Sequence, residues 1–303
     1  MPGVSGPDPR AAEGASLLGK TPNHADFLRL GVPTQAAMQL HRWLEQANTE
    51  SPLCSGFFMF ALPDTDESIV GAIVPSRDRV GRSFPLTVFT SVRFVRASGA
   101  FAWLPAASEP FLRSAANLLL ETTSSDILNQ RLPALPVPVH ADFNRAATLR
   151  AEGLKAAQAT ALQDAFATQG LSDRHLYALH TFLLACEGEK RAPGHSGVVL
   201  DCPLFPPMRW AFWLELLMRR VPTASPSLAW TDHRLLISFD PSSPSLLSFL
   251  ANPEHRSSKL WPLLTQRQAA IDIARDELPA QAREVLNRPD VSFDVVLQTL
   301  ARC

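Results

Sequence analysis

The sequence predicts an α/β protein with a mixed, mainly antiparallel sheet. Two observations support this fold class. Short runs rich in β-branched and aromatic residues follow one another at distances typical of hairpins, and runs with apolar residues at helical spacing flank them. Both halves of the chain contribute strands and neither has enough alone for a covered sheet, so one globular unit is expected. The six expected strands are 57–62, 69–76, 84–92, 196–201, 228–231 and 234–239.

Helices are expected wherever apolar residues recur every three or four positions. The expected helical segments are 33–48, 109–128, 141–168, 172–186, 207–220 and one that starts within 245–251. Ser172 or Asp173 is the expected cap of the fourth. The segment Leu132–Pro138 contains three prolines, which remove backbone donors and disfavour helix before them, so it is a connector rather than an α-helix.

Three stretches of the chain differ in composition. Residues 1–14 are predicted to be a disordered tail because they are rich in proline, glycine and alanine. Residues 15–264 are expected to form the main α/β domain. Residues 265–303 are charged and alanine-rich, with breaks at Pro279 and Pro289, and are expected to form a C-terminal helical extension.

Composition excludes several classes of protein. Of the 303 residues, 46% are hydrophobic and 19% charged, which is typical of a globular chain, and a net charge of −1 gives no general attraction to nucleic acid or anionic lipid. No signal-peptide core and no apolar window of about 18 residues is present, so a cytoplasmic protein without membrane insertion is expected. Cys186, His195 and Cys202 match no zinc spacing, so no metal or other cofactor is expected.

The segment Gly14–Thr21 satisfies the P-loop pattern G-x-x-x-x-G-K-[ST]. A P-loop requires a buried strand before it and a helix directly after it, and neither is indicated, because Pro22 follows Thr21 at once. Leu17 and Leu18 are better interpreted as the end of a strand. A P-loop nucleotide-binding enzyme is therefore only the alternative interpretation.

No complete catalytic set is recognisable elsewhere. Gly194-His195-Ser196-Gly197 lacks the second glycine of a nucleophile elbow, because Val198 stands there. His24 and Asp26 share a motif but no nucleophile accompanies them, and a hydrogen-bonded turn explains such a pair. The chain is therefore expected to be no enzyme.

The segment Arg77–Arg82, called the basic loop below, is the serious candidate for a site. It lies between two expected strands and carries three arginines and Asp78. One interpretation is structural: Asp78 accepts hydrogen bonds from turn amides or pairs with an arginine, while Gly81 supplies a positive φ. The other is a contact surface, because guanidinium groups suit carboxylate or phosphate. Lys20 and Asp26 would complete the constellation if their segment meets the loop. The candidate partner-binding residues are Lys20, Asp26, Arg77, Asp78, Arg79 and Arg82.

Two segments carry a family resemblance. Residues 19–33, GKTPNHADFLRLGVP, match GKxPxxxDF, and residues 75–86, PSRDRVGRSFPL, match PSxDxxGRxFPL. Together they resemble the TagF/ImpM family of type VI secretion accessory proteins. Residues 227–232 are similar to the family's later SLWWT/S segment, with Ala229 in place of its first tryptophan. The resemblance runs from about Leu17 to Leu264, which makes the main domain TagF-like.

The resemblance implies both a fold and a function. The family's fold is a three-layer α/β/α sandwich. Its members resemble post-translational repressors of type VI secretion assembly in Gram-negative bacteria, acting through a forkhead-associated scaffold protein. Some are fused to a serine/threonine phosphatase, but this chain lacks recognisable phosphatase metal carboxylates, so a stand-alone, non-enzymatic module for protein–protein interaction is expected. A structural component of the secretion apparatus is a further alternative.

Overall fold

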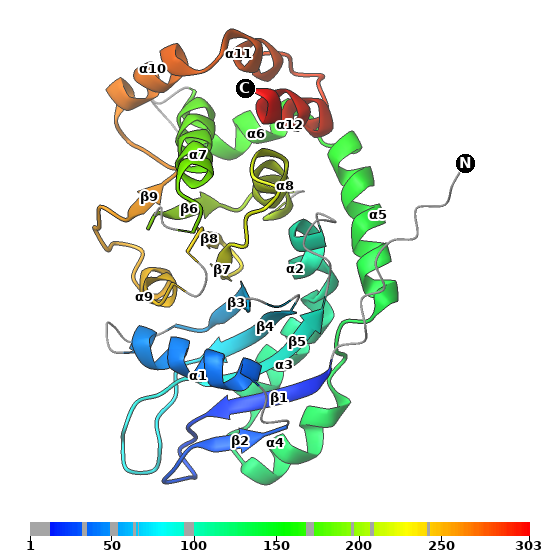
Figure 1. The fold of residues 1–303 in the computed structure, drawn as a ribbon, viewed down its shortest axis with the longest axis vertical. Coiled ribbons are helices and arrows are strands. Elements are labelled where there is room, and N and C mark those ends of the chain that lie inside the picture. Colours follow the sequence, from blue (N-terminus) through cyan, green and yellow to red (C-terminus); the bar gives the residue numbers. More distant parts are fainter. Residues whose placement is uncertain are drawn as a thin grey trace.

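A computed structural model gives the fold (Figure 1). It describes residues 13–303 apart from 32–34, 49–53, 63, 64, 66, 94–99, 168–172, 195, 196, 207, 208, 241 and 242. Within these residues, nine strands form one sheet in the order β2-β1-β5-β4-β3-β7-β8-β6-β9. The strands are β1 Glu13–Gly19, β2 Leu28–Leu30, β3 Gly56–Ala61, β4 Glu67–Val74, β5 Leu86–Arg93, β6 Val199–Pro203, β7 Ser227–Trp230, β8 Arg234–Ser238 and β9 Leu260–Pro262.

The predicted fold class is confirmed. Every strand pair is antiparallel except β6 with β9, so the sheet is mixed and mainly antiparallel. The six expected strands correspond to β3–β8 within a few residues at each end, whereas β1, β2 and β9 were not among them. The β7–β8 hairpin turns around Asp232 and His233, and the Thr231 amide donates to the Arg234 carbonyl at 3.0 Å.

Helices flank the strands in sequence. The α-helices are α1 Gln35–Asn48, α2 Leu104–Ala107, α3 Glu109–Glu121, α4 Ser125–Arg131, α5 His140–Ala156, α6 Ala159–Phe166, α7 Arg174–Arg191, α8 Ala211–Arg220, α9 Ser245–Ala251, α10 Gln268–Glu277, α11 Ala280–Leu286 and α12 Phe293–Arg302. The connector Leu132–Pro138 contains a single 3₁₀ turn at Leu132–Ala134, so it is no α-helix.

Two predicted helices are divided. The segment 109–128 breaks after Glu121, where Asn23 from the β1–β2 loop donates to the Thr123 carbonyl at 3.3 Å. The segment 141–168 breaks between α5 and α6, where the Phe293 amide donates to the Ala157 carbonyl at 2.8 Å. In both places a distant part of the chain donates a hydrogen bond to a backbone carbonyl at the break. The periodicity of the local sequence does not reveal such long-range bonds.

The predicted cap of α7 was wrong in its chemistry. Asp173 occupies the N-cap position but makes no side-chain capping bond, and its carboxylate pairs with Arg275 of α10 at 2.9 Å instead. Ser172, the other candidate cap, lies outside the described residues.

The sheet separates two apolar clusters, because alternate residues of a strand point to opposite faces. Met59, Val70 and Val88 belong to the larger cluster, to which α3, α7, α8 and α12 contribute. Phe58 and Ile69 belong to the smaller cluster with side chains of α1 and α9. Helices therefore pack against both faces of the sheet. Each cluster includes residues from before and after the connector, so one unit forms, as predicted.

The C-terminal helices, α10–α12, and the first two strands, β1 and β2, lie at opposite ends of the molecule (Figure 1). Leu278 and Phe293 of this C-terminal segment are buried in the larger cluster. The division at residue 265 remains a prediction. At the other end, Glu13 pairs with Ser91 in β1–β5, so the last two residues of the predicted tail belong to the sheet, and residues 1–12 lie outside the described residues.

No helix in the described part of the chain has the length and apolar character needed to span a bilayer.

Candidate functional site

The two motif segments singled out in the sequence meet in space. The basic loop joins β4 to β5 and lies against the β1–β2 loop. The Arg79 amide donates to the His24 carbonyl at 2.9 Å, and the Arg82 guanidinium donates to the Ala25 carbonyl. Segments about 57 residues apart thus form one surface.

Asp78 is the centre of this surface, and its side chain is buried. One carboxylate oxygen, Oδ2, accepts from Lys20 Nζ at 3.1 Å and from Arg82 Nε at 2.6 Å. The other, Oδ1, accepts from the Val80 and Arg82 amides at 3.0 and 2.8 Å. Four donors on one carboxylate saturate it, so Asp78 fixes the loop and does not face a partner.

The charge of Asp78 is set by these contacts. Burial by itself raises the pKa of a carboxyl group, but the hydrogen bond from the Arg82 amide and the Lys20 and Arg82 side chains outweigh it. The pKa of Asp78 is therefore held well below its usual value. The carboxylate stays ionised at any physiological pH, and the loop keeps its ion pairs.

The loop backbone is a closed turn. Arg77 pairs with Ser83 across it, the Asp78 amide donates to the Arg82 carbonyl at 3.0 Å, and the Gly81 amide donates to the Asp78 carbonyl at 2.9 Å. Gly81 has a φ of 90°, as the structural interpretation of this glycine requires. The loop is thus rigid at its base and at its tip.

Lys20 belongs to the frame of the loop rather than to its surface. It is 7% exposed, and its ammonium lies 5.1 Å from the centre of the Phe27 ring. Phe27 in turn meets Phe84 edge-to-face at 4.7 Å, which joins the two motif segments by an apolar contact as well. Lys20 is therefore a positioning residue.

The remaining candidates lie on the outside. Arg77 and Arg79 are exposed, and within the described residues neither side chain has a hydrogen-bond or ion-pair partner. The Arg82 side chain is 61% exposed although its guanidinium is held by Asp78. Asp26 is exposed too, but its carboxylate accepts from the amide of Phe27 at 2.7 Å. The structure brings all six candidates into one region, and the three arginines of the basic loop are exposed on its surface.

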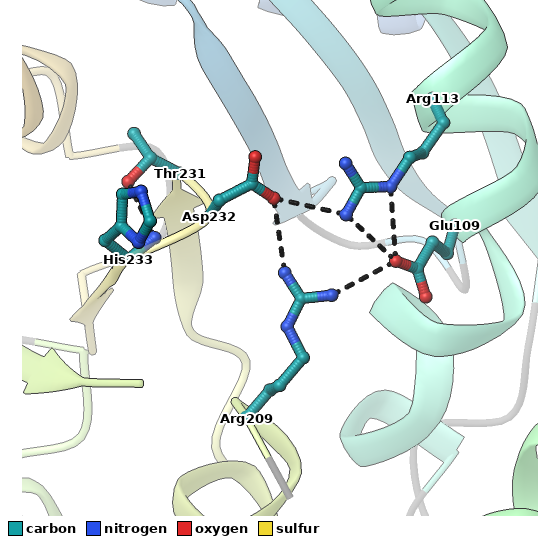
Figure 2. A network of polar contacts seen from close by, with 6 residues as sticks. All are labelled: Glu109, Arg113, Arg209, Thr231, Asp232 and His233. Carbon is teal, nitrogen blue, oxygen red and sulfur yellow. Dashed lines mark hydrogen bonds and ion pairs between the residues drawn. The ribbon is translucent and has the colours of Figure 1, made fainter. Parts of the chain in front are cut away.

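A second polar network was not predicted from the sequence. Figure 2 shows Arg113 of α3 and Arg209, just before α8, each bridging Glu109 and Asp232. Arg113 lies 3.3 and 3.1 Å from the two carboxylates, and Arg209 lies 3.2 and 3.3 Å from them. The ring joins α3, the start of α8 and the β7–β8 turn. Its charges alternate and cancel, so it acts as a clamp between distant segments.

A groove of about 790 Å³ lies beside this network, between α3, α5 and the start of α8. Apolar and polar residues both line it, and three of the polar ones are arginines. Each of these is already paired: Arg113 with Glu109, Arg145 with Asp142, and Arg150 with Glu215. The groove therefore offers no unpaired charge to a ligand.

Thiol chemistry is disfavoured at the two buried cysteines. Cys186 and Cys202 are free and buried, and burial raises the pKa of the Cys186 thiol to about 12. Neutral thiols are poor nucleophiles and poor metal ligands. Among the described residues no group of three His, Cys, Asp or Glu is arranged to hold a metal, and His195 lies outside them.

The P-loop interpretation of Gly14–Thr21 does not fit the structure. Gly14 to Gly19 form part of strand β1, which pairs with β2 and β5, so these residues make no phosphate-binding turn. A Cβ on Gly19 would lie 2.2 Å from the Pro85 carbonyl oxygen, so this glycine allows close approach of the chain before β5. Lys20, which would bind phosphate in a P-loop, is buried and forms an ion pair with Asp78.

We accordingly expect no saturable binding of ATP and magnesium at millimolar concentration. The measurement is isothermal calorimetry on the purified chain, with Lys20→Ala as the matched variant. Saturable heat in the wild type that disappears in Lys20→Ala would contradict this expectation.

Comparisons with known proteins agree with the sequence motifs. Residues 46–135 match the family described as the TagF N-terminal domain, type VI secretion system-associated; this range includes the basic loop. None of the curated proteins matches the sequence. Among solved structures, PA0076 from Pseudomonas aeruginosa PAO1 is similar, with 15% identity, a TM-score of 0.44, and coverage of 82% of this chain and 98% of that one. The resemblance inferred from the motifs is thus confirmed for this part of the chain: residues 46–135 are similar to the TagF N-terminal domain, which is described as type VI secretion system-associated.

Proposed function

We propose that this chain is a non-enzymatic accessory protein that represses assembly of the type VI secretion system after translation, by binding a forkhead-associated scaffold protein. The observation that supports the proposal is the basic loop: three outward arginines stand on a frame fixed by the buried Asp78. The family's association with type VI secretion supplies the biological context.

The rigidity of the loop favours binding over catalysis. Arginines on a preorganised turn lose little conformational entropy when a partner docks, which leaves more of the contact energy for affinity. The polar groups nearest the loop are already engaged: Lys20 with Asp78, and His24 with Ser125 at 2.9 Å. None of these is left as an activated nucleophile or base, which supports a binding module.

The proposal includes a place of action. Assembly control through a scaffold requires the chain to meet that scaffold in the cytoplasm of a Gram-negative bacterium. The protein partner is then recognised by surface contacts rather than through a cofactor.

Deletion of the gene tests the repressor role. We expect the deletion strain to secrete more type VI effector than its parent, and a plasmid copy of the wild-type chain to restore the parental amount. The measurement is effector release into the medium. Loss of secretion on deletion would instead identify a structural component, and unchanged secretion would end the repressor proposal.

Capture of the scaffold tests the proposed route. The immobilised wild-type chain is expected to retain the purified forkhead-associated protein. A purified type VI sheath component serves as the negative control and should not be retained. Failure of the pure scaffold to bind at micromolar concentration would contradict this partner.

A further inference from the structure

The outward face of the basic loop carries positive charge that the protein does not neutralise. Arg77 and Arg79 are exposed, and in the described part of the chain no carboxylate pairs with either. Some exposed arginines elsewhere are matched by acids, such as Arg113 and Arg131 at 2.7–3.3 Å. The unmatched arginines of the loop are therefore available to an external acid.

The only acid within the loop turns inward. Asp78 is 4% exposed and its oxygens already accept four hydrogen bonds, so it does not offset the charge seen by a partner. Arg82 is held by Asp78 and the Ala25 carbonyl, which fixes its direction. Arg82 thus acts mainly as a positioning residue, and Arg77 and Arg79 are the cations free to bind.

An exposed apolar side chain follows Arg79 in the loop. Val80 is 64% exposed at the tip of the loop, between Arg79 and the Gly81 turn. A large exposed apolar residue gains free energy when a partner covers it, at about 25 cal/mol per Å² of apolar area removed from water. The loop therefore presents an exposed apolar residue next to exposed arginines.

We propose that the basic loop binds an acidic protein segment in which carboxylates lie beside an apolar side chain. The carboxylates pair with Arg77 and Arg79, and the apolar side chain covers Val80. This inference rests on the proposed function, since it names the chemistry of the partner surface that the loop recognises. Guanidinium groups bind carboxylates with two parallel hydrogen bonds, which gives such a pair direction as well as charge.

A protein segment fits this surface better than nucleic acid or lipid. Polyanions are bound by many cations spread along a face, and their affinity falls steeply with salt for that reason. Here the loop supplies only a few cations, on a chain whose net charge is −1. A short acidic segment needs only the two or three cations that the loop supplies.

A peptide titration tests the proposal with the full-length chain. The probe is a fluorescein-labelled synthetic peptide in which a leucine is flanked on each side by paired glutamates, and the matched probe has glutamines instead. Binding is followed by fluorescence anisotropy. We expect the glutamate peptide to bind, and Arg77→Ala and Arg79→Ala each to weaken it by about tenfold or more. Val80→Ser is expected to weaken it less, and Arg288→Ala, which removes an exposed arginine elsewhere, to leave it unchanged.

Three outcomes would overturn the inference: equal binding of the glutamine peptide, undiminished binding by both arginine variants in folded form, or tighter binding of duplex DNA or phosphatidylserine vesicles than of the glutamate peptide. Circular dichroism confirms that each variant is folded.

The same variants separate this inference from the proposed function. A scaffold that binds the wild type and both arginine variants equally would refute the acidic-segment inference and leave the repressor proposal standing. If the chain binds the glutamate peptide through Arg77 and Arg79 but fails to bind the scaffold, the acidic-segment inference stands and the proposed scaffold partner is refuted.

Discussion

Replacing Asp78 with asparagine is expected to lower the melting temperature more than any other single substitution in the basic loop. Asparagine keeps the size of the side chain but removes its charge, so the ammonium of Lys20 stays buried without a counter-ion. An unpaired buried charge is among the most destabilising changes a protein can suffer. Differential scanning fluorimetry of the variants measures the effect.

The control is Asp26→Asn in the facing loop. The Asp26 carboxylate is exposed and accepts only the next amide, a bond that an asparagine oxygen also accepts, so its melting temperature should stay close to that of the wild type. Arg77→Ala should also have little effect, because Arg77 has no ion-pair partner in the described residues. Equal losses in Asp26→Asn and Asp78→Asn would show that Asp78 does not organise the loop.

The Asp78 carboxylate also sets a pH dependence. Its pKa is lower in the folded chain than the value of about 3.9 for an unfolded aspartate, so the folded state favours the ionised form. The stability that this group contributes is therefore present in full above about pH 5 and is lost as the pH falls below about 4. The difference in stability between wild type and Asp78→Asn should shrink over that acid range.

Replacing Phe293 with alanine is expected to destabilise the whole protein by about 3–5 kcal/mol, since a large buried aromatic side chain leaves a cavity when truncated. Phe293, the first residue of α12, is 0% exposed, and its ring lies 5.1 Å from that of Phe212 and 6.2 Å from that of Phe205. For a chain of this size the loss corresponds to a fall in melting temperature of about 10 °C.

Val295 on the same helix supplies the control. Its side chain is 45% exposed, so Val295→Ala should change the stability by less than about 0.5 kcal/mol. Urea unfolding of both variants gives the free energies. A single transition that shifts as a whole in Phe293→Ala is expected if residues 265–303 unfold with the sheet. A separate early transition with the main transition unmoved would show an independent extension.

Strands with clear patterns were located from the sequence, whereas β1 was recognised only at its end, through Leu17 and Leu18, and β2 and β9 were not predicted. The segments of β3, β4 and β5 are rich in Phe, Val and Ile between turn residues, and the sequence located them within a few residues. Strand β1 reads EGASLLG, which has no β-branched residue and resembles a P-loop, and β2 has only three residues. These strands form because β5 provides an edge for β1, and β1 then provides one for β2.

Part of the candidate site could be predicted from the sequence, namely the basic loop but not its long-range contacts. Charge density and turn residues identified the basic loop, but whether Lys20 would reach Asp78 depends on the packing of β1 beside β5, which local patterns do not encode. The ring around Arg209 was invisible, because its partners lie 23 and 100 residues away and each residue looks like an ordinary surface charge. Long-range pairing decides both cases.

The junction between β3 and β7 has a consequence for folding during synthesis on the ribosome. Only three residue pairs join these strands, from Phe57 opposite Trp230 to Met59 opposite Leu228, and they connect the five N-terminal strands to the four C-terminal ones. A ribosome adds about 5–20 residues per second, so the edge of β3 waits on the order of 10 s for its partner. During that time it exposes a phenylalanine-rich strand edge, which readily pairs with other chains. The yield of folded protein is therefore expected to depend on the rate of translation between β3 and β7.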